Sequence, residues 1–177
     1  MKKILLMLMA FASISAWADD VSSELIHSIS ERLSYMEDVA LYKAQKHVPI
    51  EDVAREKLVV DESKMSAKES GLDPESIEAF FRAQISVAKA IQYRVRADLL
   101  STPSEQQPKD LVKEVRPALI HLGDEIILGM SKYLEEHSSF RDVSFEEFST
   151  DVNIGYVTES DKRLLYDALL KVAPLAS

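Results

Sequence analysis

Apolar residues along most of this chain recur every three or four positions, the spacing of one face of an α-helix. The first such stripe follows Leu25, Ile29, Leu33, Met36 and Ala40. Strand-like alternation is nearly absent, and glycine is scarce, with four residues in all. The pattern predicts an all-α protein, a single-domain bundle of about six helices with a long N-terminal helix.

The ends of the first two helices are indicated by proline and glycine. The first helix is expected from about Ser22 to His47, because Pro49 follows and the residue before a proline avoids the α region. The second is expected from about Ile50 to Ser70, with Gly71 as a left-handed cap.

A third helix has the clearest start signal. Asp73 is a good N-cap, and Pro74 suits the first helical position. Leu72 and Ile77 fit the hydrophobic staple that flanks such a start. We expect this helix to end near Leu99.

Three more helices are predicted beyond the linker at Ser101–Pro108. The fourth should run from about Arg116 to Glu136, since proline at position 117 is tolerated in a first turn. Ser144 and Glu147 are spaced as a capping box for a short fifth helix, and Thr158 is expected to cap the last.

Residues 1–18 have the composition of a secretory signal peptide. Two lysines follow Met1, a short apolar run comes next, and Ala16-Trp17-Ala18 offers a cleavage site. Cleavage after Ala18 predicts a periplasmic or secreted protein; a retained N-terminal anchor is the alternative. The mature chain suits one domain, in which residues 19–100 form a helical core and residues 109–177 complete it.

The chain is acidic, and this limits its partners. Its net charge is −9, and loss of the two signal lysines makes it −11. Such a protein is a poor candidate for binding nucleic acid or, in its mature form, a membrane surface. It has no cysteine, no histidine pair at metal-ligand spacing, and no phosphate-binding or nucleophile motif. We therefore expect no metal, no cofactor and no covalent catalysis.

Cations gather on one predicted helix face. Arg32 and Lys43 are 11 residues apart, so in a helix they lie within roughly 20° of each other and about 16 Å apart. Arg55 follows 12 residues later, beyond the break at Pro49. In an acidic protein, a small anion needs such a local cluster. Spacing alone favours the simpler alternative, in which these side chains reach solvent or pair with Glu31, Glu37 or Asp38.

Polar residues also follow one stripe of the third predicted helix. Gln84, Ala88 and Gln92 are four residues apart, over about 12 Å. Gln92 lies among apolar positions, so its amide should face partly inward and needs partners. The pattern alone favours an interhelical hydrogen bond or a glutamine at the exposed edge.

Four short motifs stand out along the first half of the chain: Glu31-Arg32-Leu33, Leu41-Tyr42-Lys43, the stretch from Pro49 to Arg55 (PIEDVAR), and Ala90-Ile91-Gln92-Tyr93. Together they resemble the all-helical chorismate mutases, and the spacings of 11 and 12 residues between the cations match that family without gaps. A looser similarity extends through Asp110-Leu111 and Arg116 to the C-terminus. The signal segment points to the secreted, periplasmic subclass, the gamma subclass of the AroQ type.

This resemblance implies an isomerase that converts chorismate to prephenate in the phenylalanine and tyrosine branch of aromatic amino acid biosynthesis. The reaction is pericyclic: a C–O bond breaks as a C–C bond forms. It needs no nucleophile, metal or redox cofactor, in keeping with the missing motifs. The resemblance also implies a homodimer in which each chain builds its own site.

The resemblance further assigns roles to particular residues. Arg32 and Arg116 would each hold one carboxylate of the substrate, where the planar guanidinium suits bidentate contact. Lys43 and Gln92 would be catalytic, donating to the ether oxygen, with a second contact from Lys43 to a carboxylate. Negative charge grows on that oxygen in the transition state, so both donors would bind the transition state more strongly than the substrate.

Three more residues would complete the site. Asp52 and Arg55 would hold the ring hydroxyl, partly through the backbone, with Glu56 as a further acceptor. One position departs from the family pattern: relatives tend to have serine or threonine where this chain has Ala88. Without that hydroxyl, either a neighbour or water replaces it, or substrate binds more weakly.

Two other functions fit the same residues. One is a lyase on the same scaffold that removes pyruvate from isochorismate. The other is a non-enzymatic periplasmic helical binding protein whose cations meet a partner's acidic surface. The second requires Arg32 and Lys43 to be exposed and Gln92 to lie far from them.

Overall fold

The computed structural model describes residues 12–176 of the chain, with side chains from residue 21 onward. Residues 1–11 of the predicted signal segment therefore lie outside the described part. The predicted all-α fold is confirmed over the described residues, and none of their helices is long and apolar enough to cross a membrane. In chain order the elements are α1 (Ala12–Ser34), α2 (Met36–Gln45), α3 (Val53–Glu69), α4 (Pro74–Ser101), the π-helix η1 (Leu111–Val115), α5 (Arg116–Glu136), the 3-10 helix η2 (Phe140–Asp142), α6 (Phe145–Asp151) and α7 (Glu159–Leu169).

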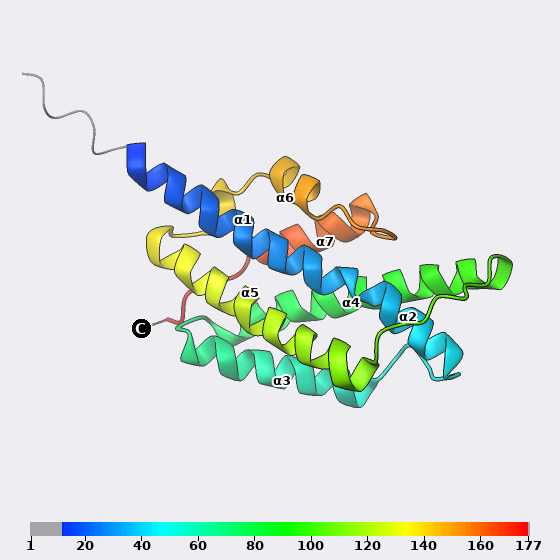
Figure 1. Ribbon diagram of the computed structural model, residues 1–177. Helices are drawn as coiled ribbons and strands as arrows, with labels where there is room; N and C mark the ends of the chain where they lie inside the picture. The colour runs from blue at the N-terminus through cyan, green and yellow to red at the C-terminus, as the bar shows by residue number, and fades with distance from the viewer. Residues whose placement is uncertain (1–11, 177) are drawn as a thin grey trace, which may run out of the picture.

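The long helices lie side by side along one direction (Figure 1). Helix α1 packs mainly against α5, and α4 contacts α2, α3 and α7. Helices α6 and α7 lie on the side of α1 away from α3 (Figure 1). One continuous hydrophobic cluster extends from Leu25 in α1 to Val172 beyond α7 and includes the fully buried Phe80, Phe81 and Phe148. Both halves of the sequence thus contribute to the same core.

The predicted single helix from Ser22 to His47 is wrong in two respects: α1 already begins at Ala12, and the helix is interrupted at Tyr35. Ser34 Oγ donates to the Glu31 carbonyl at 2.7 Å, competing with the helix for a backbone acceptor. Tyr35 has φ −66° and ψ −13°, and α2 begins at the next residue. Arg32 and Lys43 therefore belong to two successive helices.

Capping side chains set the next boundaries. Helix α3 begins at Val53, later than the predicted Ile50, because Asp52 accepts from the Arg55 backbone N–H at 3.0 Å. Gly71 has φ +73°, as expected for a left-handed cap. Asp73 caps α4 by accepting from the N–H groups of Glu75 and Ser76, which confirms the predicted start.

The start of α5 contains a turn that the sequence did not predict. After the linker, Asp110 accepts from the N–H groups of Val112 and Lys113, and η1 follows with π-helical geometry. The Arg116 N–H donates to the Leu111 carbonyl, five residues back. Helix α5 then begins at Arg116, as predicted. The π-turn therefore lies directly before Arg116 and connects the linker to α5.

The last two helices start where the sequence indicated. Ser144 accepts from the Glu147 N–H at 3.1 Å and so caps α6. Thr158 caps α7, and here the reciprocal capping box is complete with Asp161.

The Asp73 cap can be tested directly. Asp73→Ala removes acceptors for two N–H groups, so the free energy of unfolding should fall by about 1 kcal/mol. Urea unfolding measures the change. Glu135→Ala replaces an exposed acid inside α5 and is the control, expected within about 0.5 kcal/mol of the parent. An equal effect of both substitutions would contradict the capping role.

Candidate active site

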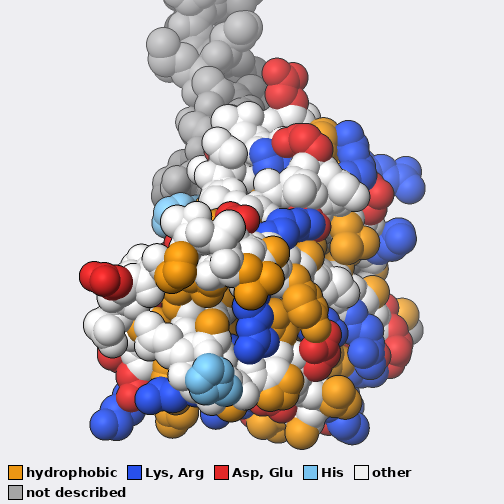
Figure 2. All heavy atoms as spheres, turned by 90° about the vertical axis from the view of Figure 1, so that its right-hand side faces the viewer, with side chains coloured by type: hydrophobic (Ala, Val, Ile, Leu, Met, Phe, Trp, Pro, Cys, Tyr) orange, Lys and Arg blue, Asp and Glu red, His pale blue; other side chains and the backbone are white. Residues whose placement is uncertain are grey.

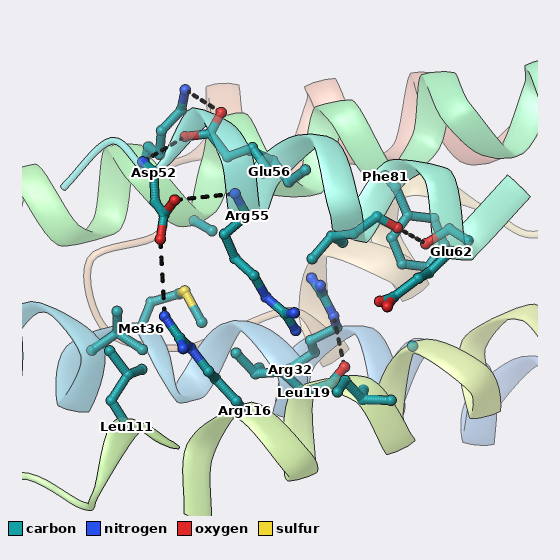
Figure 3. A pocket seen from close by; sticks show the side chains of 18 of the residues that line it. Arg32, Met36, Asp52, Arg55, Glu56, Glu62, Phe81, Leu111, Arg116 and Leu119 are labelled. Atoms are coloured by element: carbon teal, nitrogen blue, oxygen red, sulfur yellow. Dashed lines mark hydrogen bonds and ion pairs between the residues drawn. The ribbon is translucent and has the colours of Figure 1, made fainter.

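One pocket, of about 170 Å³ accessible to water, lies between α1, α2, α3, α4 and α5. The residues singled out from the sequence come from five separate segments, and Figure 3 shows the arginines among them directed toward one space. Apolar walls are supplied by Met36, Phe81 and Leu111. The structure brings all seven predicted site residues to this pocket: Arg32, Lys43, Asp52, Arg55, Glu56, Gln92 and Arg116.

Arg32 lies at the inner wall, with 6% of its surface exposed. Its Nη1 donates to Gln84 Oε1 at 2.6 Å, and its Nε donates to the Leu119 carbonyl at 3.4 Å. Its guanidinium carbon lies 5.5 Å from the centre of the Phe81 ring. In the described structure Arg32 does not pair with a nearby carboxylate, which was the alternative that the sequence allowed. The side chain is thus held by α4 and α5 through neutral groups.

The positive charge of Arg32 lowers the stability of the fold, because the guanidinium is buried. Burial, and then the nearby Arg55, lower the pKa of Arg32 to about 10. The guanidinium therefore remains cationic near neutral pH. Among the side chains that the structure describes, neither Arg32 nor Arg55 forms an ion pair. An anion entering the pocket would meet two cations without counter-charges.

Lys43 approaches the pocket from α2. Its Nζ donates to the Ile50 carbonyl in the segment that leads to α3. Burial lowers the pKa of Lys43, while Asp52 and Glu56 counteract part of that shift. The lysine therefore has acidic neighbours that favour its charged form without contacting it as an ion pair.

At the pocket edge, Asp52 contacts the backbone of one cationic residue and the side chain of another. Its Oδ1 accepts from the Arg55 N–H, and its Oδ2 lies 3.9 Å from Arg116 Nη2 (Figure 3). Both side chains of the Asp52–Arg116 pair are more than a third exposed, so the pair contributes little stability. Arg116 can therefore exchange this partner for a stronger anion at little cost.

Glu56 is already engaged by the protein. Its Oε1 accepts from the Asp52 N–H at 3.4 Å, and its Oε2 pairs with Lys89 at 3.0 Å. Lys89 lines the pocket and was not predicted from the sequence. It directly follows Ala88, but nothing in the apolar pattern distinguished it from an exposed lysine.

The amide of Gln92 is buried at 4% exposure but points back along its own helix. Its Nε2 donates to the Ala88 carbonyl at 3.1 Å and lies 3.6 Å from Met36 Sδ. Its Oε1 is buried without a hydrogen-bond partner in the described structure. The amide must therefore rotate before it donates to a ligand.

The sequence did not predict the part that three further residues play at this pocket. Gln84 was noted only as part of the polar stripe, yet it contacts Arg32. Glu62 and Asp124 line the pocket from α3 and α5, opposite in sign to the cations. No spacing rule connects residues 62 and 124, since only packing of the two helices brings them together.

The positive charge is a local property of the pocket. On the end of the molecule facing the viewer in Figure 2, basic and acidic side chains are mixed, with hydrophobic side chains between them. Burial of Arg32 and the presence of Gln92 in the same pocket also disagree with the binding-protein hypothesis, which needs exposed and separated groups.

Comparison with known proteins finds a family model and relatives that all have the same description, chorismate mutase. The family model described as "Chorismate mutase type II" matches residues 14–93. A monofunctional chorismate mutase of Enterobacter agglomerans is 34% identical over 166 residues, which cover 92% of this chain and 91% of that protein. A secreted chorismate mutase of Yersinia pestis is 47% identical over 108 residues, covering 60% of this chain and 58% of that protein.

A solved structure is also similar. The crystal structure of secreted chorismate mutase from Yersinia pestis superposes with a TM-score of 0.81 and 36% identity, covering 85% of this chain and 97% of that one. The similarity therefore includes the C-terminal helices as well as the segment matched by the family model.

The buried charge predicts an unusual response to mutation. Because the pKa of Arg32 is lower in the folded chain than its ordinary value, the charged guanidinium costs stability at every pH below about 10, and the cost fades as pH rises above it. Arg32→Met should therefore leave the free energy of unfolding unchanged or raise it by up to about 3 kcal/mol at neutral pH. Urea unfolding measures it.

Arg141→Met makes the same change at an exposed position and should have no effect. A clear loss of stability in Arg32→Met alone would show that the contacts of Arg32 outweigh its desolvation, contrary to this account.

Proposed function

Because the chain belongs to the type II chorismate mutases, we propose that the pocket between α1, α2, α3, α4 and α5 is where this enzyme converts chorismate to prephenate. The supporting observation is that Arg32, Lys43, Arg55 and Gln92, from four different helices, line one pocket. The reaction is an intramolecular rearrangement, and such a pocket would accelerate it by charge and orientation alone.

The two carboxylates of the substrate are assigned to Arg32 and Arg116. Arg32 is fixed by neutral partners and has no ion pair among the described side chains, so its charge is available. Arg116 begins α5 directly after the π-turn, and its ion pair with Asp52 is long, at 3.9 Å, and more than a third exposed, so its charge is also available. Binding both carboxylates would hold the substrate in the compact conformation that reacts.

The ether oxygen is assigned to Lys43 and Gln92. As the C–O bond stretches, negative charge grows on this oxygen, so a cation and an amide donor stabilise the transition state more than the substrate. Lys43 Nζ would keep or exchange its contact with the Ile50 carbonyl, while the Gln92 amide would leave the Ala88 carbonyl. This rotation would free the Nε2 hydrogens for the substrate.

The ring hydroxyl is assigned to the start of α3, where Asp52, Arg55 and Glu56 are adjacent. The Asp52 carboxylate already contacts the Arg55 N–H and Arg116, and the Glu56 carboxylate contacts the Asp52 N–H and Lys89, which would hold both carboxylates in place when the hydroxyl binds. No proton transfer is required of any of them. This accounts for carboxylates in a pocket that binds a dianion.

Export and assembly belong to the same proposal. Two relatives of this chain, 47% and 31% identical over the matched residues, are named secreted chorismate mutases. We infer that residues 1–18 are a signal peptide cleaved after Ala18 and that the mature enzyme acts in the periplasm or outside the cell. We also infer a homodimer with one complete site in each chain. N-terminal sequencing and the solution mass of the exported protein test these points.

The activity is tested by incubating the protein, from Asp19 onward, with chorismate and identifying the product. Formation of prephenate supports the proposal. The alternative lyase would instead release pyruvate from isochorismate, so both substrates are assayed with the same preparation. Pyruvate release without prephenate formation would replace the mutase by the lyase.

Loss of a key donor should strongly reduce activity. Lys43→Ala and Arg32→Ala are each expected to lower kcat/KM for chorismate by at least about 100-fold, as is typical when a preorganised donor is removed. Lys46→Ala removes an exposed cation one turn from Lys43, outside the pocket, and should leave kcat/KM unchanged. Turnover near the parent level in both site variants would contradict the assignment.

The absence of a serine or threonine hydroxyl at position 88 predicts a smaller effect on activity. Ala88 lines the pocket, so Ala88→Ser should place a hydroxyl beside the bound substrate. We expect kcat to be retained and KM to be equal or lower, measured in steady-state kinetics. A large loss of activity would show that position 88 is too tightly packed for an added oxygen.

A further inference from the structure

Gln84 is a polar residue where a helix core normally holds an apolar one. It lies on α4 one turn before Ala88 and is completely buried. Its Oε1 accepts from Arg32 Nη1 at 2.6 Å, while its Nε2 has no hydrogen-bond partner within the described structure. A buried amide with one unsatisfied end is a burden for folding, so packing alone does not account for this residue.

The contact fixes how Arg32 faces the pocket. Gln84 Oε1 and the Leu119 carbonyl bind Nη1 and Nε, and the Phe81 ring lies near the guanidinium plane. Nη2 makes no hydrogen bond to any described residue and, with the second hydrogen of Nη1, is left to bind a ligand. Two parallel N–H donors of this kind match a carboxylate.

The neutrality of Gln84 matters as much as its position. A glutamate at this place would have nearly the same shape but would form a buried ion pair with Arg32. The guanidinium would then carry less net charge toward a substrate carboxylate. The amide holds the cation without neutralising it.

We propose that Gln84 is a positioning residue that orients Arg32 and preserves its charge for a carboxylate of the substrate. This inference rests on the proposed mutase function. It assigns Gln84 no contact with the substrate, since Gln84 does not line the pocket.

The decisive variant is Gln84→Glu, assayed for chorismate turnover and for thermal unfolding. The new carboxylate would meet a cation that is already desolvated, so the unfolding midpoint should stay equal or rise. At the same time kcat/KM should fall by at least about 10-fold, mainly through KM, because the carboxylate is held in both the ground and the transition state. Stability and activity thus change in opposite directions.

Gln84→Met provides a second, uncharged test. It keeps the length of the side chain but removes the acceptor, and kcat/KM should fall by about 10-fold, again mainly through KM. The control is Val87→Ala, a buried position on the same helix that does not line the pocket. It should lower the unfolding midpoint and leave kcat/KM within about twofold.

The possible results distinguish failure of the proposed mutase function from failure of the positioning role of Gln84. A parent protein that forms no prephenate overturns the proposed function, and this inference with it. An active parent with unchanged kcat/KM in Gln84→Met or Gln84→Glu overturns the positioning role alone. So does a loss of activity that follows the loss of stability, as a purely structural residue would give.

Discussion

A buried positive charge without a counter-ion is the constraint on which the rest of this site depends. Arg32 is 6% exposed, and its partners in the described structure are a glutamine, a backbone carbonyl and an aromatic ring. Such a charge is tolerated only if its surroundings are rigid and its donors are partly satisfied. The hydrophobic cluster of α1, α4 and α5 supplies that rigidity, because it fixes the helix that carries Arg32 and the two helices that contact it.

Most groups of the site lie in the first or last turn of a helix. Arg32 is in the last turn of α1 and Lys43 in the last turn of α2, while Gln92 lies inside α4. Asp52 caps α3 and also faces Arg116, which begins α5 after the π-turn. A residue at a helix end can therefore stabilise the fold and belong to the site at once.

Much of this arrangement was predictable from the sequence, for identifiable reasons. The caps Asp73, Ser144 and Thr158 act through neighbouring residues, so local pattern was enough. The cluster of cations was expected because a spacing of 11 residues and the family resemblance agreed. The Gln84–Arg32 contact joins residues 52 apart in sequence, and the Glu56–Lys89 pair joins residues 33 apart. Such contacts depend on helix packing, which a periodic pattern does not specify; the break at Tyr35 and the π-turn likewise left no compositional signal.

The buried Arg32 and the half-buried Lys43 are kept charged in different ways, and the difference follows from their chemistry. A lysine loses its proton more readily when buried, and Asp52 and Glu56 oppose that shift for Lys43. An arginine begins with a much higher pKa, so Arg32 at about 10 stays charged beside neutral groups only. The carboxylates are therefore useful next to the lysine, whereas next to the arginine they would only compete with the substrate. Asp52 and Glu56 accordingly act on Lys43, while a glutamine holds Arg32.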